Sequence, residues 1–307
     1  MTDVPLVLGR ATVLPSERAA LYSGARRGEL VTVSRGCWVR AEVWHALDDA
    51  ARHRVLCRAI QATCGGDVIF SHQSAVALWN LPWFGDWPQK AHTLFVTSGS
   101  GRSTRQVVRH GRLELPQPSL VNGLLATPLI ATVVDVASTA GFESAVVVAD
   151  AALRVLTRDA RVDEVKTAMR HEAHRIALTH GRAKAERVID FADPRADRPG
   201  ESLSRVSILR TGLTAPDLQV HLRGASGRSY TVDFYWPEFD VIGEFDGRVK
   251  YTDPEFLRGG TAEQAVYDEK LREDDLRAVP HAFTRWKWST ALSPAALGAL
   301  LRRAGVR

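Results

Sequence analysis

The sequence YTVDFYWPEFDVIGEFDG, from Tyr230 to Gly247, contains two short strands on either side of a turn at Pro237. Val, Ile, Phe, Tyr and Trp favour strands, and two such runs joined by a turn predict a hairpin within a sheet. Each strand carries one carboxylate, Asp233 in the first and Glu244 in the second. Because an unpaired charge inside a sheet is costly, both carboxylates need a compensating partner. A divalent cation such as Mg²⁺ suits them, since hard cations take oxygen ligands.

The segments around this hairpin predict an α-β-β-β-α-β domain over residues 201–307. Besides the hairpin strands, the expected elements are a helix over Glu201–Thr211, a strand near Leu218–Leu222, a helix over Ala262–Ala278 and a strand over Ala282–Trp288. This order would bring Glu201, Asp233 and Glu244 together at the edge of the sheet, where they could bind one or two Mg²⁺ or Mn²⁺ ions. The alternative is that Asp233 and Glu244 end their strands and face solvent, with Asp246 and Gly247 forming only a turn.

Four motifs follow one another in this region: Val232-Asp233-Phe234, Glu244-Phe245-Asp246-Gly247, Lys270-Leu271-Arg272-Glu273-Asp274 and Arg285-Trp286. With them, the chain from about residue 200 to 292 resembles the PD-(D/E)XK restriction-endonuclease-like superfamily, in the branch related to very-short-patch-repair endonucleases. The resemblance implies a restriction-endonuclease-like fold and magnesium-dependent hydrolysis of DNA phosphodiesters. It also implies that Asp233 and Glu244 hold the metal, while Glu201 holds a second ion or the attacking water.

One position departs from the pattern of that superfamily. Its members usually carry a lysine two residues after the second carboxylate, where the ammonium group orients the water and stabilises charge on the phosphate. This chain has Asp246 at that position. Lys270, on the following helix, is the expected substitute within the catalytic group, and Lys250 is the second choice. Both also fit the pattern of surface lysines, so the domain is either a nuclease or a scaffold that does not cut.

The first 45 residues predict a compact winged-helix module that binds DNA. Its expected elements are a helix over Leu6–Leu14, an arginine-rich helix over Glu17–Arg27, and a hairpin of strands Leu30–Ser34 and Cys37–Arg40. Residues 1–112 hold 14 Lys and Arg against 8 Asp and Glu, which favours contact with a polyanion. The arginines expected at the DNA are Arg18, Arg26, Arg27, Arg35, Arg102 and Arg105. The alternative is a surface helix whose arginines only keep the chain soluble.

A second resemblance covers residues 6–154. The segments Ala25-Arg26-Arg27-Gly28-Glu29-Leu30-Val31, Arg35-Gly36-Cys37-Trp38-Val39 and Ser71-His72-Gln73-Ser74-Ala75-Val76-Ala77-Leu78-Trp79-Asn80-Leu81-Pro82 are similar to AbiEi-type antitoxins of type IV toxin-antitoxin systems. These are winged-helix DNA-binding regulators, so the resemblance implies a cognate toxin as a partner. Residues 46–192 are expected to form an α+β middle domain of this type, and residues 193–200, which contain two prolines and a glycine, a linker to the last domain.

Length and composition predict an α/β protein of several domains: 307 residues, 45% of them hydrophobic, with a net charge of +5. No apolar stretch reaches the roughly 18 residues that a membrane span needs, and the N-terminus lacks the segments of a secretion signal. We therefore expect a cytoplasmic protein without a membrane partner. Cys37, Cys57 and Cys64 lack disulfide or zinc spacing and are expected in the core. His171, His174 and His180 are interpreted as surface residues.

The sequence thus supports two hypotheses. The first is a DNA-binding protein with an Mg²⁺-dependent endonuclease domain. The second is a transcriptional regulator or antitoxin whose nuclease-like domain is not catalytic.

Overall fold

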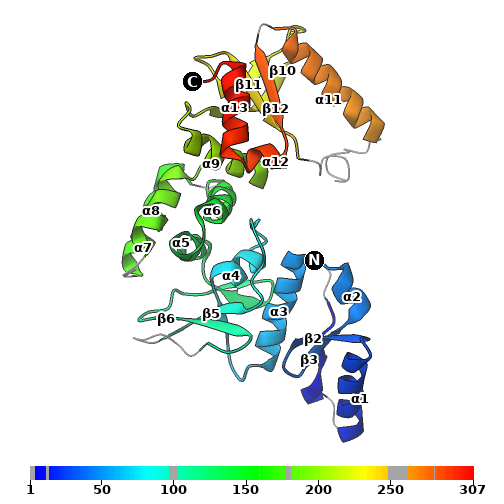
Figure 1. Ribbon diagram of the computed structural model, residues 1–307. Helices are drawn as coiled ribbons and strands as arrows, with labels where there is room; N and C mark the ends of the chain where they lie inside the picture. Colours follow the sequence, from blue (N-terminus) through cyan, green and yellow to red (C-terminus); the bar gives the residue numbers. More distant parts are fainter. Residues whose placement is uncertain are drawn as a thin grey trace. The chain divides into compact units, whose positions relative to one another are not determined.

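Two units make up the chain, Met1–Ala192 and Asp193–Arg307, each with its own sheets, helices and core (Figure 1). The computed structural model describes residues 4–11, 14–96, 103–158, 160–176, 181–247, 262–279 and 281–307, with the side chains of 262–269 left out. The fold is mixed α/β, as expected. No helix in these ranges is long and apolar enough to cross a membrane.

The first unit begins with a three-stranded sheet in the order β1-β3-β2. Its elements are β1 (Val7–Leu8), the 3-10 helix η1 (Gly9–Ala11), α1 (Pro15–Arg26), β2 (Leu30–Ser34) and β3 (Cys37–Arg40). The hairpin of β2 and β3 has the predicted bounds. The helix predicted over Leu6–Leu14 is wrong, because Val7 and Leu8 instead pair with Trp38 and Cys37 in an antiparallel ladder. Pairing buries these apolar residues against β3, which a short isolated helix could not do.

The rest of the first unit is a five-stranded sheet and a set of helices, some of which pack on this sheet and others on one another. The strand order is β6-β5-β4-β8-β7, with β4 (Ile69–Phe70), β5 (Ala91–Val96), β6 (Val107–Arg112), β7 (Ser119–Val121) and β8 (Leu124–Ala126). The helices are α2 (Ala41–Ala46), α3 (Asp49–Thr63), α4 (His72–Leu78), α5 (Leu129–Thr139), α6 (Phe142–Leu156), α7 (Val162–Arg175) and α8 (Arg182–Phe191). A core of buried apolar side chains joins β3, α3, α4 and the sheet. Cys37 and Cys57 lie in this core as expected, whereas Cys64 is exposed.

The second unit is a four-stranded sheet, β12-β11-β10-β9, in which β11 and β12 are parallel and the other pairs antiparallel. Its elements are α9 (Pro199–Thr211), β9 (Asp217–Arg223), β10 (Ser229–Trp236), β11 (Val241–Phe245), α11 (Ala262–Arg277), β12 (Ala282–Trp286), α12 (Trp288–Ala291) and α13 (Pro294–Ala304). The α-β-β-β-α-β order predicted from the sequence is present. The last strand ends at Trp286 rather than at Trp288, because Trp288 begins a helix.

Different helices cover the two faces of this sheet. On one face Phe234, Trp236 and Trp286 pack with Ile208 of α9 and Leu297 of α13. On the other face Val232 and Ile242 pack with Leu276 of α11. Figure 1 shows α11 on the opposite side of the sheet from α9 and α13. The carboxylates of the hairpin therefore lie within a sheet that is covered on both sides.

Candidate functional site

Glu201 and Asp233 form the acidic centre of the second unit. Glu201 is in the first turn of α9, and only 4% of it is exposed. The helix can begin this close to the sheet because Gly200 lies against the ring of Phe245, where a Cβ atom would come within 2.0 Å of the ring. Glycine at this position thus fixes where Glu201 stands relative to β10 and β11.

Glu201 is held by two hydrogen bonds, and its surroundings raise its pKa. Its Oε2 accepts from the backbone N–H of Asp197 at 2.8 Å and from Nε2 of Gln219 at 3.1 Å. Burial and, after it, the negative charge of Asp233 raise the pKa of Glu201 to about 8. A carboxyl group whose pKa is raised by a neighbouring carboxylate is typical of acidic functional sites. A cation bound between Glu201 and Asp233 would lower the pKa of Glu201 again.

Asp233 lies at a distortion of the sheet. Its Oδ2 accepts from the backbone N–H of Phe245 at 2.9 Å, next to the last regular pair between β10 and β11, Phe234 with Gly243. On its other side, the regular pairs between β10 and β9 leave out Asp233 and Gln219, and Gln219 has a left-handed φ of 51°. Left-handed backbone at a residue other than glycine stores strain and is common at functional sites. The same Gln219 donates to Glu201, so the strained residue links the two acids.

Glu244 is compensated by arginines. It is only 3% exposed and forms ion pairs with Arg272 of α11 and with Arg285 of β12, the latter at 2.8 Å. Arg272 also donates to the carbonyl of Thr231 at 2.8 Å, and Arg285 contacts Glu273 at 3.1 Å. The charge expected to need a metal is thus balanced by the protein itself. Among the described residues, the three acids do not form a cluster whose ligand atoms all lie within 4.8 Å of one another.

The remaining predicted catalytic residues lie around this centre. Asp246 follows β11, is partly buried, and donates its backbone N–H to the carbonyl of Trp286 at 2.8 Å. Lys270 is exposed on α11, and the cation of this helix that reaches Glu244 is Arg272. Lys250 lies outside the described residues. The cations that contact Glu244 are therefore the arginines Arg272 and Arg285, and not the lysine expected from the sequence.

The arginines predicted to contact DNA differ in their surroundings. Arg18 donates to the carbonyl of Gly9 at 3.3 Å, and Arg26 donates to Ser23 at 3.4 Å. Arg27 makes two hydrogen bonds to Glu29, at 2.8 and 2.9 Å, and this contact raises the pKa of the Arg27 guanidinium.

Arg35 and Arg105 are both exposed, and Gln106, the residue after Arg105, binds the backbone at Arg35. The side chain of Gln106 accepts from the backbone N–H of Arg35 at 3.3 Å and donates to the carbonyl of Val33 at 3.2 Å. The turn between β2 and β3 is thereby attached to the segment that precedes β6. Arg102 lies outside the described residues.

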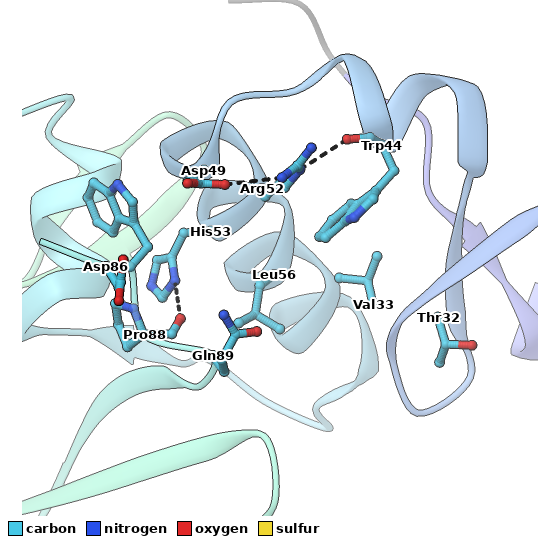
Figure 2. Close-up of a pocket in the computed structure, with 11 residues that line it drawn as sticks. Thr32, Val33, Trp44, Asp49, Arg52, His53, Leu56, Asp86, Pro88 and Gln89 are labelled. Atoms are coloured by element: carbon cyan, nitrogen blue, oxygen red, sulfur yellow. Dashed lines mark hydrogen bonds and ion pairs between the residues drawn. The ribbon is translucent and has the colours of Figure 1, made fainter.

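The first unit also contains an open cleft of about 700 Å³ beside α3 (Figure 2). Trp44 and Arg52 line it, and Arg52 donates to the carbonyl of Trp44 at 3.2 Å and to Asp49 at 3.1 Å. His53 lies between Pro88, whose carbonyl is 3.0 Å from Nδ1, and Ser74, whose Oγ is 2.8 Å from Nε2. Burial lowers the pKa of His53 to about 4, so this imidazole is neutral at pH 7.

Sequence reasoning missed a second polar centre, formed by His72, His92 and His110. The structure brings them together from α4, β5 and β6, although 20 and 18 residues separate them in sequence. No short spacing marks such a group. The signal in the sequence is weak: His72 and His92 lie next to short apolar runs that predict strands, whereas His110 lies in an arginine-rich segment.

Comparison with known proteins gives relatives without a described activity. No family model matches the chain. Two curated proteins of Mycobacterium tuberculosis, uncharacterized protein MT2308 of strain CDC 1551 / Oshkosh and uncharacterized protein Rv2248 of strain ATCC 25618 / H37Rv, are each 34% identical over 142 residues. The match covers 46% of this chain and 50% of each relative, so the chain spans about half the length of these proteins.

The solved structures that match include that of the RV2827C protein from Mycobacterium tuberculosis. It covers 60% of this chain and 75% of that chain, with 14% sequence identity and a TM-score of 0.34. A similarity this low carries no argument about the fold or function.

Proposed function

We propose that the protein binds DNA and that its second unit hydrolyses phosphodiesters with Mg²⁺ or Mn²⁺. The observation that carries this proposal is the buried Glu201 beside the partly buried Asp233, held close by α9, β9 and β10. Keeping two acids together in a covered sheet costs free energy unless a cation binds them. Two carboxylates are a donor set that suits a hard divalent ion.

In this proposal Glu201 and Asp233 hold the ion, which supplies water activation and neutralises phosphate charge. The protein contributes position and positive charge. Gln219 and the backbone N–H of Asp197 orient Glu201, and the N–H of Phe245 orients Asp233. Arg272 and Arg285, fixed by Glu244, stand beside the next strand and offer guanidinium groups to a phosphate, as the missing lysine would.

DNA binding is proposed for the first unit. The support is the basic surplus of residues 1–112 together with the exposed Arg35 and Arg105 near one turn. Guanidinium groups attract the phosphate backbone without regard to sequence. The cytoplasm is the proposed compartment.

The experiment is cleavage of supercoiled plasmid by the full chain with Mg²⁺ or Mn²⁺, with and without chelator. Glu201→Gln and Asp233→Asn should each abolish nicking, because each removes a ligand charge without changing size much. Glu238→Gln, at an exposed acid in the turn of the same hairpin, is the matched control and should cut like the unaltered protein. Cutting that survives chelator, or that survives both ligand variants, would refute the proposal.

A specific observation favours the second hypothesis, a regulator or antitoxin with a non-catalytic domain. Glu244, one of the two acids expected to hold metal, is occupied by two guanidinium groups. Under this hypothesis the protein retards DNA but never cuts it, across several DNA and RNA substrates and both metals. It would also copurify with a cognate toxin expressed beside it.

A further inference from the structure

Three histidines of the first unit, His72, His92 and His110, lie close together. His92 and His110 are on the paired strands β5 and β6, and His72 is the first residue of α4. His92 on β5 pairs with Val108, and His110 on β6 pairs with Leu94, so the two histidines are diagonal neighbours on the same face of parallel strands. The backbone N–H of Ser71 donates to the carbonyl of His92 at 3.0 Å, which fixes the start of α4 and therefore His72 beside them. Ring nitrogens of all three residues lie within 4.8 Å of one another.

The distances between these nitrogens are close to those around a bound transition metal. Nδ1 of His92 and Nε2 of His110 are 3.0 Å apart. In a tetrahedral zinc site with bonds of about 2.0–2.1 Å, two ligand nitrogens are about 3.3 Å apart. Nδ1 of His72 is 3.0 Å from Oγ of Ser71, so this contact takes one nitrogen of His72 and leaves Nε2 as its ligand atom.

In the metal-free protein Nδ1 of His92 and Nε2 of His110 share a hydrogen bond, which a metal would replace with two bonds to ring nitrogens. Burial lowers the pKa of His92 and of His110 to about 4, and lowers that of His72 well below its usual value. Magnesium and calcium prefer oxygen, whereas imidazole suits Zn²⁺, Co²⁺, Ni²⁺ and Cu²⁺.

A buried carboxylate stands behind His72. Asp135 is 3% exposed, and its Oδ2 lies 3.9 Å from Nδ1 of His72. Its Oδ1 forms an ion pair with Arg112, while Oδ2 accepts no hydrogen bond of normal geometry from the described residues. Histidines that bind metals commonly donate the second ring N–H to a carboxylate, which fixes the ring and raises the basicity of the ligand nitrogen, and Asp135 would take this role by closing the 3.9 Å gap to Nδ1 of His72.

One adjustment is needed for three lone pairs to meet at one point. The ring of His110 is stacked on that of His72, with centroids 3.7 Å apart and planes 15° apart. Since lone pairs lie in the ring plane, His110 must turn out of this stack. His92 and His110 are only partly buried, so both rings have room to turn, whereas His72 is fixed.

We propose that His72, His92 and His110 form a binding site for one divalent cation of the zinc class. The fourth position is left for water or a small anion, on the side where His92 and His110 are partly exposed. This site is separate from the carboxylate pair of the second unit and does not depend on the function proposed for it.

Titration of the full chain tests this site, after treatment with chelator and dialysis. With excess Mg²⁺ present to occupy carboxylate sites, Zn²⁺ followed by calorimetry should bind with one equivalent per chain, and Co²⁺ should give the visible absorption bands of a tetrahedral nitrogen-rich site. His92→Gln and His110→Gln should each weaken Zn²⁺ binding by about tenfold or more. His171→Gln, at an exposed histidine of α7, and Asp233→Asn, in the other unit, should bind as the unaltered chain does.

Asp135→Asn gives an independent readout, because it leaves the three ligands in place. It should weaken Zn²⁺ binding by about 10- to 100-fold while the metal-free protein keeps its circular dichroism spectrum. The proposal is overturned if no one-to-one binding is found, or if His92→Gln and His110→Gln bind Zn²⁺ as tightly as the unaltered chain. It is also overturned if Asp233→Asn removes the Zn²⁺ site, since the ion would then lie in the second unit.

Discussion

At the scale of single residues, the acidic centre depends on Gly200. This glycine touches the ring of Phe245, which is itself buried and packed edge-on against Trp288 with ring centroids 5.1 Å apart. Any side chain at residue 200 would push α9 away from β11. Glu201 is the next residue, so the spacing between Glu201 and Asp233 changes with that movement. A residue without chemistry of its own therefore sets the geometry of the pair.

Gly200→Ala should destabilise the second unit by about 1–3 kcal/mol, the usual cost of overpacking a buried site. Thermal denaturation followed by circular dichroism measures this loss, and plasmid nicking should fall with it. Gly66→Ala, where a Cβ atom would meet open space, is the control and should leave the unfolding temperature nearly unchanged. Adding Phe245→Leu to Gly200→Ala should recover part of the stability. If Gly200→Ala is as stable as the unaltered protein, the contact does not position α9.

His53 should make the first unit less stable in acid. Its pKa is about 4 in the folded protein, whereas an exposed imidazole has a pKa of about 6.5. Between these values the unfolded chain binds the proton and the folded chain does not, so the stability is present above pH 6.5 and is lost as the pH falls towards 4. The full effect corresponds to about 3 kcal/mol.

Urea denaturation at a series of pH values between 7 and 4 tests this prediction. Between pH 7 and 4 the unaltered protein should lose up to about 3 kcal/mol of its free energy of unfolding through His53, and His53→Gln should not show this part of the loss. His72, His92 and His110 have lowered pKa values too, so part of the dependence should remain. His171→Gln, which replaces an exposed imidazole, serves as the control. An unchanged pH dependence in His53→Gln would contradict the prediction.

At the scale of elements, the sequence predicted correctly those helices and strands that depend on residues close together in the chain. The hairpin of β2 and β3, the strands of Asp233 and Glu244, and α11 were all predicted from local sequence patterns. The helix expected over Leu6–Leu14 was not formed, because two residues of it pair with β3, a partner about 30 residues further along the chain. Propensity within a short window cannot report such a partner.

The turn between β2 and β3 should be the first part of the DNA-binding surface to respond to mutation. Arg35→Ala and Arg105→Ala should each weaken binding to DNA of any sequence and lower the slope of log K against log salt by about one. Arg27→Ala is the matched control, because Glu29 already binds that guanidinium. Fluorescence anisotropy with a labelled duplex over a range of salt concentrations measures both effects. Equal salt slopes in all three variants would place the phosphate contacts elsewhere.

At the scale of the whole molecule, topology decides which distant residues meet, and a sequence pattern does not record it. The sequence predicted a glutamate, an aspartate and a glutamate at one sheet, and the structure does bring Glu201 near Asp233. The sequence could not show that Glu244 pairs with Arg272 and Arg285. One of these arginines, Arg285, lies on β12, which follows α11 and pairs with β11 in parallel. The three histidines of the first unit come from separate elements and were missed for the same reason.

The parallel pairing of β11 with β12 has a consequence for how the second unit folds. Arg285 lies 41 residues after Glu244, so a large loop must close before their ion pair forms. During synthesis β11 leaves the ribosome well before β12 and carries an unpaired edge on that side, which other chains can join. Glu244 forms its ion pair with Arg285 only when β12 pairs with β11. A chain that stops before Ala282 should therefore aggregate, even though it contains every predicted catalytic residue.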